Sequence, residues 1–323
     1  MPKVSVLVAV YNAERWLKPC LDSLASQTLS DIQIVCVDDA STDGSLAILN
    51  DYARRDSRFE VIPMKENIGM SKARNMALSY ATGEYVCMLD ADDWYGPDAF
   101  ERAVDVFMQH PQTDVVLFQF MLVYPDHEQL YPSQSFTVLD GRTACQLSID
   151  WQIHGIYMVR SAIHKQYPYD DTCRLFSDEN TTRLHYAVAR EVRCCSGTYY
   201  YRQHDSSMTH RPTVRQFDKL RAKESLIASL RNLQFDVCQL TNMLWLDVVD
   251  LYMFYHVHGH QLTIAERQYG LQELYRVWAT IDRKVLNKKT ITKFGYRPCR
   301  SWRLFRLQEW LYFTLRGLLG KNH

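Results

Sequence analysis

The sequence of 323 residues lacks several features that mark particular classes of protein. No apolar run reaches the roughly 18 residues that a transmembrane helix needs, so we expect no membrane-spanning segment. The N-terminal residues include neither a long apolar segment nor a small-residue cleavage site, so we expect no signal peptide. The nine cysteines include no Cys-x-x-Cys pair. An odd number of cysteines without an export signal is typical of a reduced, cytosolic protein, not of a disulfide framework or a zinc site.

Motifs of three classes of protein that bind nucleotides or nucleic acids are also missing. No Gly-x-Gly-x-x-Gly follows the first predicted strand, which disfavours a Rossmann oxidoreductase. A glycine-rich basic phosphate loop, which a nucleotidyltransferase would usually contain, is absent near the N-terminus. No nucleic-acid-binding motif accompanies the basic residues, so we expect no nucleic-acid partner.

The net charge of zero, from 37 Lys and Arg against 37 Asp and Glu, is the sum of two unlike parts. Residues 1–210 hold 18 basic and 28 acidic residues, whereas residues 211–323 hold 19 and 9. Such asymmetry suggests different partners for the two parts. The hydrophobic content of 47% is ordinary for a globular protein and argues against wholesale disorder.

Apolar, β-branched runs alternate with helical patterns over about the first 120 residues. We predict strands at residues 3–10, 32–37, 59–63, 85–89 and 114–120, and helices at residues 13–26, 43–56, 69–81 and 97–109. This alternation indicates an α/β fold with a parallel sheet and helices on both faces. From about residue 213 the pattern becomes helical, so we predict a first domain over residues 1–212 and a helical, basic extension over residues 213–323.

Polar residues follow three of the predicted strands, at Tyr11-Asn12, Asp38-Asp39 and Asp90-Ala91-Asp92-Asp93. The carboxyl ends of parallel strands meet at one edge of the sheet, where ligands bind in such folds. Carboxylates two residues apart can share Mg²⁺ or Mn²⁺ with phosphate oxygens. The alternative for the last cluster is an acidic turn before Pro97.

Two further candidates have simpler alternatives. Asp39 can accept a hydrogen bond from a uracil N–H or a ribose hydroxyl, or it can cap the next helix, a role that suits Ser41 or Thr42 better. Arg74 can reach a phosphate or a base, or it can be a solvated charge on a helix.

The first 100 residues resemble glycosyltransferase family 2, which has the GT-A fold and uses a nucleotide-sugar donor. Four ordered motifs carry the resemblance: VSVLVAVYNAERWL, SLASQTLSDIQIVCVDDASTDGS, ENIGMSKARNMALSYATGEYV and MLDADDWYGPDAF. The resemblance extends over about residues 1–210, more weakly after residue 120. It implies a donor-binding half over residues 1–120 and an acceptor-side half over residues 121–212. Ala9 departs from the proline that many relatives have at this position.

The resemblance also assigns roles to the residues of these motifs. It implies a nucleotide-sugar site formed by Ala9, Tyr11, Glu14, Asp38, Asp39, Asn67, Arg74, Asp90, Ala91 and Asp92. Asp92 would bind a divalent cation, Mn²⁺ or Mg²⁺. Asp90 would face ribose or metal-bound water, and Asp93 would contact metal or sugar.

Two later segments carry the remaining expected site residues. In LFSDENTTRL, residues 175–184, the family's catalytic Glu-Asp pair falls on Ser177 and Asp178. This makes Asp178 the expected base and Glu179 the runner-up; the alternative is an ordinary acidic helix N-terminus. In the segment that begins at Tyr199, Arg202 and His204 can contact the diphosphate, unless this is only an aromatic strand entering a polar loop.

The resemblance therefore implies an inverting, metal-dependent glycosyltransferase with UDP-sugar as the default donor. It would act in the cytoplasm on a glycan or lipid-linked acceptor, in bacterial capsule, exopolysaccharide or lipopolysaccharide synthesis. The alternatives are a nonenzymatic nucleotide-sugar-binding protein and a nucleotidyltransferase.

The basic segment 297–320 has leucines three and four residues apart, which share one helical stripe. Its arginines and aromatic residues are typical of a helix that lies on an anionic membrane, here the inner face of the cytoplasmic membrane. The alternative is a helix packed on the preceding bundle or on a second subunit of an oligomer.

Overall fold

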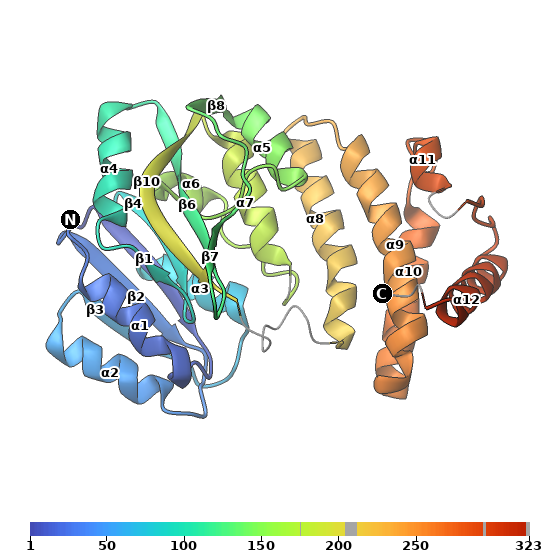
Figure 1. Cartoon of the computed structure of the whole chain (residues 1–323), viewed down its shortest axis with the longest axis horizontal. Helices are drawn as coiled ribbons and strands as arrows, with labels where there is room; N and C mark the ends of the chain where they lie inside the picture. Colours follow the sequence, from blue (N-terminus) through green and yellow to red (C-terminus); the bar gives the residue numbers. More distant parts are fainter. Residues whose placement is uncertain (175, 204–211, 293–294, 321–323) are drawn as a thin grey trace. The chain divides into compact units, whose positions relative to one another are not determined.

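The computed structural model describes residues 1–174, 176–203, 212–292 and 295–320, without the side chains of Ser177 and Asp178. The chain divides into two compact units. We call the first the sheet unit, which comprises Met1–Asp171 and Ser177–Asp205, and the second the helical unit, which comprises Thr172–Phe176 and Ser206–His323. Figure 1 shows the strands in the sheet unit and the long helices in the helical unit.

The described strands of the sheet unit form one ten-stranded sheet. They are β1 (Val4–Val10), β2 (Ile32–Asp38), β3 (Phe59–Pro63), β4 (Tyr85–Asp90), β5 (Trp94–Tyr95), β6 (Thr113–Val123), β7 (Glu128–Leu130), β8 (Val138–Asp140), β9 (Tyr157–Arg160) and β10 (Glu191–Arg202). The order is β3-β2-β1-β4-β9-β6-β10-β5, with β7 beside β6 and β8 beside β10. The four strands β3, β2, β1 and β4 run parallel to one another, and β6 and β10 also form a parallel pair. Strand β9 lies between β4 and β6 and runs antiparallel to both.

Helices cover both faces of this sheet. The described helices of the unit are α1 (Glu14–Ala25), α2 (Ser45–Arg55), α3 (Met70–Tyr80), α4 (Ala99–Gln109), α5 (Gly141–Ile149), α6 (Ser161–Gln166) and α7 (Ser177–Val188). Successive residues of a strand point to opposite faces. Accordingly, Val6 and Val8 of β1 pack in one core cluster with Leu17 of α1, whereas Leu7 packs in another with Ala73 of α3. The predicted α/β fold is therefore confirmed.

The helical unit contains α8 (Asp218–Asn232), α9 (Cys238–His258), α10 (Ile264–Thr280), α11 (Lys288–Ile291) and α12 (Trp302–Leu318) among its described residues. Helix α12 packs on α9, where the ring of Phe305 contacts Trp245 and Tyr252. Ion pairs join other helices, such as Arg221 of α8 with Glu273 of α10 at 2.8 Å. No helix of the described residues is both long enough and apolar enough to span a membrane.

Candidate active site

Strands β1, β2 and β4 end side by side at one edge of the sheet. In the parallel register Val10 lies beside Asp38, and Ala9 lies beside Asp90. Tyr11 follows β1 directly, and its side chain is exposed. The predicted convergence of polar residues at this edge is confirmed.

The turns that follow β1 and β2 hold each other in place. Asn12, in the left-handed region with φ 50°, accepts a hydrogen bond at Oδ1 from Thr42 N at 2.8 Å and donates its own N–H to Ser41 Oγ at 3.0 Å. Asparagine tolerates this backbone conformation better than most residues. Glu14, expected beside the base, accepts from Gly44 N at 2.8 Å through Oε2. The Glu14 carboxylate therefore also holds the start of α2.

Asp39 is nearly buried, and backbone amides fix its carboxylate. Its Oδ1 accepts from Ile68 N at 2.7 Å and its Oδ2 from Gly69 N at 2.9 Å. Asn67 Nδ2 donates to the carbonyl oxygen of Asp39 at 3.2 Å, which ties the two loops together. Gly69 has φ 90°, a conformation that favours glycine. Asp39 thus orders the loop that precedes α3.

Asp38 is the buried neighbour of this group. Its Oδ2 accepts from Ser41 N at 3.1 Å, within the turn that follows β2. Its Oδ1 is buried without a hydrogen-bond partner among the described residues. A buried oxygen without a donor costs free energy, so Asp38 is placed here at some cost to stability.

Arg74 of α3 is 1% exposed, so the alternative of a solvated helix charge is wrong. Its Nη2 donates to Asp90 Oδ1 at 2.5 Å, and its guanidinium lies 5.4 Å from the ring centre of Tyr169. A charge taken out of water needs an opposite charge nearby. The pair joins the N-terminal part of α3 to the end of β4.

Asp93 points into the protein towards β10. Its Oδ2 accepts from the Tyr199 hydroxyl at 2.6 Å and its Oδ1 from Arg202 N at 2.8 Å. Burial raises the pKa of Asp93 well above its usual value, and the charges of Asp90 and Asp92 raise it further. Both oxygens accept from β10, so Asp93 supports the turn that follows β4, and its contact with metal or sugar stays a prediction.

Arg202 ends β10 and anchors the same turn. Its guanidinium lies 4.7 Å from the ring centre of Trp16 and 4.6 Å from that of Trp94, in cation–π geometry. Its Nε donates to the carbonyl oxygen of Asp92 at 2.9 Å. Contact between Arg202 and a diphosphate stays a prediction. His204, predicted beside it, lies outside the described residues.

The residues at the end of β4 fit a divalent cation that shares its ligands with a substrate. No group of three or more His, Cys, Asp and Glu suited to a metal occurs among the described residues. Mg²⁺ is usually held by one or two carboxylates together with substrate phosphates, so a larger cluster is not needed. Asp92 is half-buried at the edge where Asp90 and Ala91 lie. Asp92, with the oxygens of a bound diphosphate, would hold the ion.

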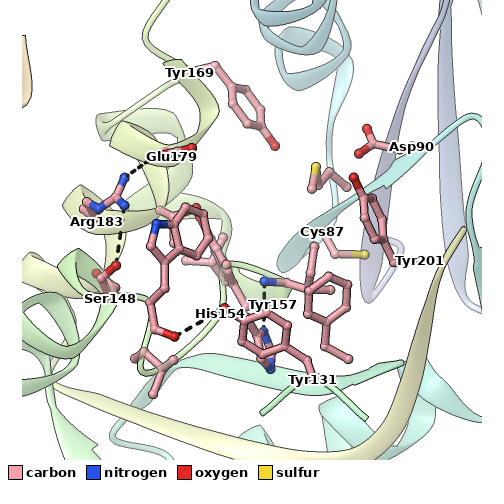
Figure 2. A pocket seen from close by; sticks show the side chains of 18 of the residues that line it. Cys87, Asp90, Tyr131, Ser148, His154, Tyr157, Tyr169, Glu179, Arg183 and Tyr201 are labelled. Atoms are coloured by element: carbon pink, nitrogen blue, oxygen red, sulfur yellow. Dashed lines mark hydrogen bonds and ion pairs between the residues drawn. The ribbon is translucent and has the colours of Figure 1, made fainter. Parts of the chain in front are cut away.

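A cavity of about 390 Å³ opens beside Asp90. Figure 2 shows Glu179 and Arg183 on one side of it and Asp90 and Tyr201 on the other. Glu179, the runner-up for the base, pairs with Arg183 Nη1 at 3.1 Å. Asp178 precedes it in the first turn of α7, but its side chain lies outside the described part of the structure.

One hydrogen-bonded group, which adjoins this cavity through Tyr157, was not predicted from the sequence. His185 is fully buried, its Nε2 lies 2.8 Å from the Tyr167 carbonyl oxygen and its Nδ1 2.7 Å from the Tyr157 hydroxyl. Burial lowers the pKa of His185 to about 4, so the ring is neutral near pH 7. A carbonyl can only accept, so Nε2 carries the proton and Tyr157 donates to Nδ1. Three separate segments supply these residues, and no motif links them.

Comparisons with known proteins agree with this arrangement. The model of the family described as "Glycosyl transferase family 2" matches residues 5–170. The chain is 31% identical over 223 residues to the uncharacterized glycosyltransferase EpsJ of Bacillus subtilis, covering 66% of this chain and 64% of EpsJ. It is 40% identical over 125 residues to the putative glycosyltransferase EpsH of the same organism, covering 39% of this chain and 36% of EpsH. The matches thus span between about a third and two thirds of these relatives' lengths.

Solved structures show the same fold. TarS 1–349 of S. aureus, in complex with UDP-GlcNAc, superposes with a TM-score of 0.72 at 19% identity, covering 99% of this chain and 92% of the 1–349 chain. This likeness confirms the GT-A fold followed by a C-terminal helical region. The family description covers more than half of the residues, so the chain belongs to glycosyl transferase family 2.

Proposed function

We propose that this chain transfers a sugar from a nucleotide sugar, with a UDP-sugar as the default, to a hydroxyl of a glycan or lipid-linked acceptor in bacterial polysaccharide synthesis. The observation that carries the proposal is the placement of Asp39, Arg74 and Asp92 at one sheet edge, beside a cavity whose far side is formed by α7. The names of EpsH and EpsJ and the nucleotide sugar bound to TarS support it.

The proposed reaction is a single displacement that inverts the anomeric configuration. The acceptor oxygen forms a bond to the anomeric carbon as the bond from that carbon to the diphosphate oxygen breaks. Asp178, which falls on the Asp of the family's catalytic Glu-Asp pair, takes the acceptor proton as general base. The bonding electrons leave with the nucleoside diphosphate. A divalent cation held by Asp92 would supply charge neutralisation at that leaving group.

A donor screen that measures nucleotide release with and without Mn²⁺ or Mg²⁺ tests the proposal. We expect release with at least one UDP-sugar, dependence on the metal, and loss of activity in Asp92→Ala. Asp126→Ala is the matched control, because Asp126 is largely exposed and pairs only with the neighbouring His127 among the described residues. Full activity in Asp92→Ala, or no release with any donor, contradicts the proposal. Configuration analysis of the product tests inversion.

We also propose that α12 contacts the inner face of the cytoplasmic membrane. Leu304, Leu307, Leu311, Leu315 and Leu318 are between 48% and 79% exposed. With 3.6 residues per turn, this row lies opposite the buried Phe305, Glu309 and Phe313, which face the helical unit. A contiguous apolar face of this kind marks an interaction surface.

Charge favours an anionic lipid surface as the partner of this face. Arg303 and Arg306 are exposed beside the leucines, whereas Glu309, the one acidic residue of α12, is buried against the Tyr296 hydroxyl. Two copies of this face would bring like charges together, which disfavours a dimer through it. Basic residues beside an apolar helix face suit anionic headgroups.

Flotation with vesicles tests this contact. We expect the chain to float with vesicles that contain phosphatidylglycerol and to stay behind with phosphatidylcholine alone. Leu307→Ser combined with Leu311→Ser should abolish flotation, and Leu130→Ser, an exposed leucine of the sheet unit, should not. Unchanged flotation of the double variant contradicts the contact, and concentration-dependent sedimentation lost in that variant would assign the face to self-association.

A further inference from the structure

The cavity beside Asp90 extends well beyond the edge where a nucleotide would bind. Its residues come from β4, β6, β9 and β10 of the sheet, from α7, and from the segment around Trp151. A volume of about 390 Å³ lies in the range of small-molecule sites. The chemistry of its lining therefore indicates what kind of molecule enters.

Aromatic side chains form much of the lining. They are Phe120, Tyr131, Trp151, Tyr157, Tyr169 and Tyr201. A pyranose ring presents C–H groups on its faces and hydroxyls at its edge, so it packs against aromatic rings while its hydroxyls reach polar groups. Tyrosine and tryptophan combine a large apolar surface with a polar atom and serve both needs.

Trp151 is held in a defined position at one side of the cavity. Its φ of 57° lies in the left-handed region, which is unusual for a bulky residue and is found most often where function requires it. The Tyr131 hydroxyl donates to its carbonyl oxygen at 3.3 Å, and the Arg183 guanidinium lies 5.3 Å from its ring centre. The indole is 47% exposed, so part of its surface is open to a ligand.

The described lining contains two carboxylates and one guanidinium, and each carboxylate pairs with an arginine. Asp90 pairs with Arg74 behind it, and Glu179 pairs with Arg183, which is 4% exposed. Arg183 Nη2 also lies 3.5 Å from the Ser148 carbonyl oxygen. Each of these two arginines has a carboxylate beside it.

Two histidines in the lining are uncharged. Burial lowers the pKa of His154 to about 4, and burial together with the charges of His185 and Arg74 lowers the pKa of His164 well below its usual value. Both ring nitrogens of His164 are buried without a hydrogen-bond partner among the described residues. A neutral imidazole has no net charge, so neither histidine offers a cation to an anionic ligand.

We infer that this cavity holds an uncharged sugar ring and discriminates against sugars that carry a carboxylate, sulfate or phosphate. The inference rests on the proposed sugar transfer and specifies its substrate. Among the described residues, an anionic group here would lose its water without meeting a cation that lacks a carboxylate partner, which is costly. Hydroxyls lose less, and the tyrosines of the lining can hydrogen-bond to them.

Binding of matched glycosides tests the inference without turnover. The probes are p-nitrophenyl β-D-glucoside, β-D-galactoside and N-acetyl-β-D-glucosaminide, each compared with p-nitrophenyl β-D-glucuronide, by saturation-transfer NMR titration of the full chain. We expect at least one neutral glycoside to bind about tenfold or more tightly than the glucuronide. Equal or tighter binding of the glucuronide, or no binding of any neutral probe, overturns the inference.

Two substitutions assign the binding to the cavity. Glu179→Gln keeps the shape of the side chain but leaves Arg183 without its carboxylate, so glucuronide affinity should rise about tenfold while neutral affinity changes little. Trp151→Ala should weaken the neutral probe about threefold to tenfold. Trp310→Ala, an exposed tryptophan of α12, is the matched control and should bind like the wild type. A glucuronide affinity unchanged in Glu179→Gln, or neutral binding unchanged in Trp151→Ala, contradicts the inference.

The uncharged ring can belong to the donor or to the acceptor, and competition distinguishes the two. Displacement of the glycoside by UDP-glucose but not by UDP assigns the ring to the donor. Glycoside binding that persists with UDP-glucose assigns it to the acceptor. Because these measurements need no catalysis, a failed donor screen with intact selectivity would overturn the proposed transfer alone.

Discussion

Acidic side chains have different partners in the two units. In the sheet unit, Asp39 and Asp93 accept hydrogen bonds from backbone amides and a tyrosine hydroxyl at strand ends. In the helical unit, Asp247 pairs with Lys219 at 2.7 Å and Glu273 pairs with Arg221 and Arg276 between helices. Asp39 and Asp93 of the sheet unit thus shape loops around the site, whereas Asp247 and Glu273 of the helical unit join helices.

This difference in partners relates to the net charge of each unit. The acidic excess of the sheet unit includes the groups that position a nucleotide and a cation in our proposal. The basic excess of the helical unit includes α12, where Arg303 and Arg306 lie exposed beside the leucine row. Substitutions in the two units should therefore affect different measurements.

The largest effect is expected from the proposed base. Asp178→Asn should lower kcat by about 10²–10⁴, because a carboxamide cannot take the acceptor proton. Steady-state transfer to an acceptor glycan measures it, with binding of the donor by calorimetry as a second readout. The control is Asp250→Asn on α9 of the helical unit, where we expect unchanged kcat. A kcat within about threefold of the wild type for Asp178→Asn would move the role of base to Glu179.

Breaking an ion pair at the site should lower the free energy of unfolding more than breaking an ion pair between the helices. Arg74→Met removes the cation that faces Asp90 from a position that is 1% exposed, and should lower the free energy of unfolding by about 3–5 kcal/mol. Arg221→Met should cost about 1 kcal/mol, because the Arg221 side chain is 47% exposed and Arg276 still pairs with Glu273.

Urea denaturation followed by tryptophan fluorescence measures both variants. Asp90→Asn added to Arg74→Met should recover part of the lost stability, since it removes the unpaired charge, but it should recover no activity. Equal costs for the two arginines would remove the distinction between the units.

Acidification should have opposite effects on the stability contributed by His154 and His185 of the sheet unit and by Glu309 of the helical unit. The pKa of His154 and of His185 is lowered to about 4 by burial, so the unfolded chain takes up protons below pH 6.5 before the folded chain does. The stability that these two histidines contribute is therefore lost between pH 6.5 and 4. Burial raises the pKa of Glu309 to about 7, so the folded helical unit takes up a proton first and gains stability as the pH falls from 7 towards 4.5.

Each of these groups should contribute about 2 kcal/mol between pH 7 and pH 5. Hydrogen exchange of peptides from β9 and α7, corrected for intrinsic rates, should speed up at pH 5, while exchange in α12 should slow down. Glu309→Gln should remove the change in α12 and leave that of the sheet unit. Faster exchange of α12 in the wild type at pH 5 would contradict the expected sign.

The smallest effect on stability is expected at the exposed face of α12. Leu311→Ser should change the free energy of unfolding by less than about 0.5 kcal/mol, because the side chain has little contact to lose. The urea midpoint measures this for the same protein that is used for flotation. A loss above about 2 kcal/mol would show that Leu311 packs inside the protein, as buried core leucines do.

The sequence predicted the parallel strands and the edge at which they end, because apolar runs and terminal polar residues are local patterns. It did not predict that β9 runs antiparallel between β4 and β6, since pairing between distant segments leaves no short-range signal. Arg74 was left open between two readings, because burial of a helical charge depends on Asp90 and Tyr169, which come from other elements. For the same reason the group of His185, Tyr157 and Tyr167 was missed.

The stacking of Arg202 between Trp16 and Trp94 has a practical consequence. Indole emission responds to a charge near the ring, and here a guanidinium joins both indoles to the carbonyl of Asp92. Any ligand that shifts the Asp92 turn would move that charge and alter the emission. The chain therefore carries its own optical probe of donor binding, which Trp16→Phe or Trp94→Phe would silence without a label being attached.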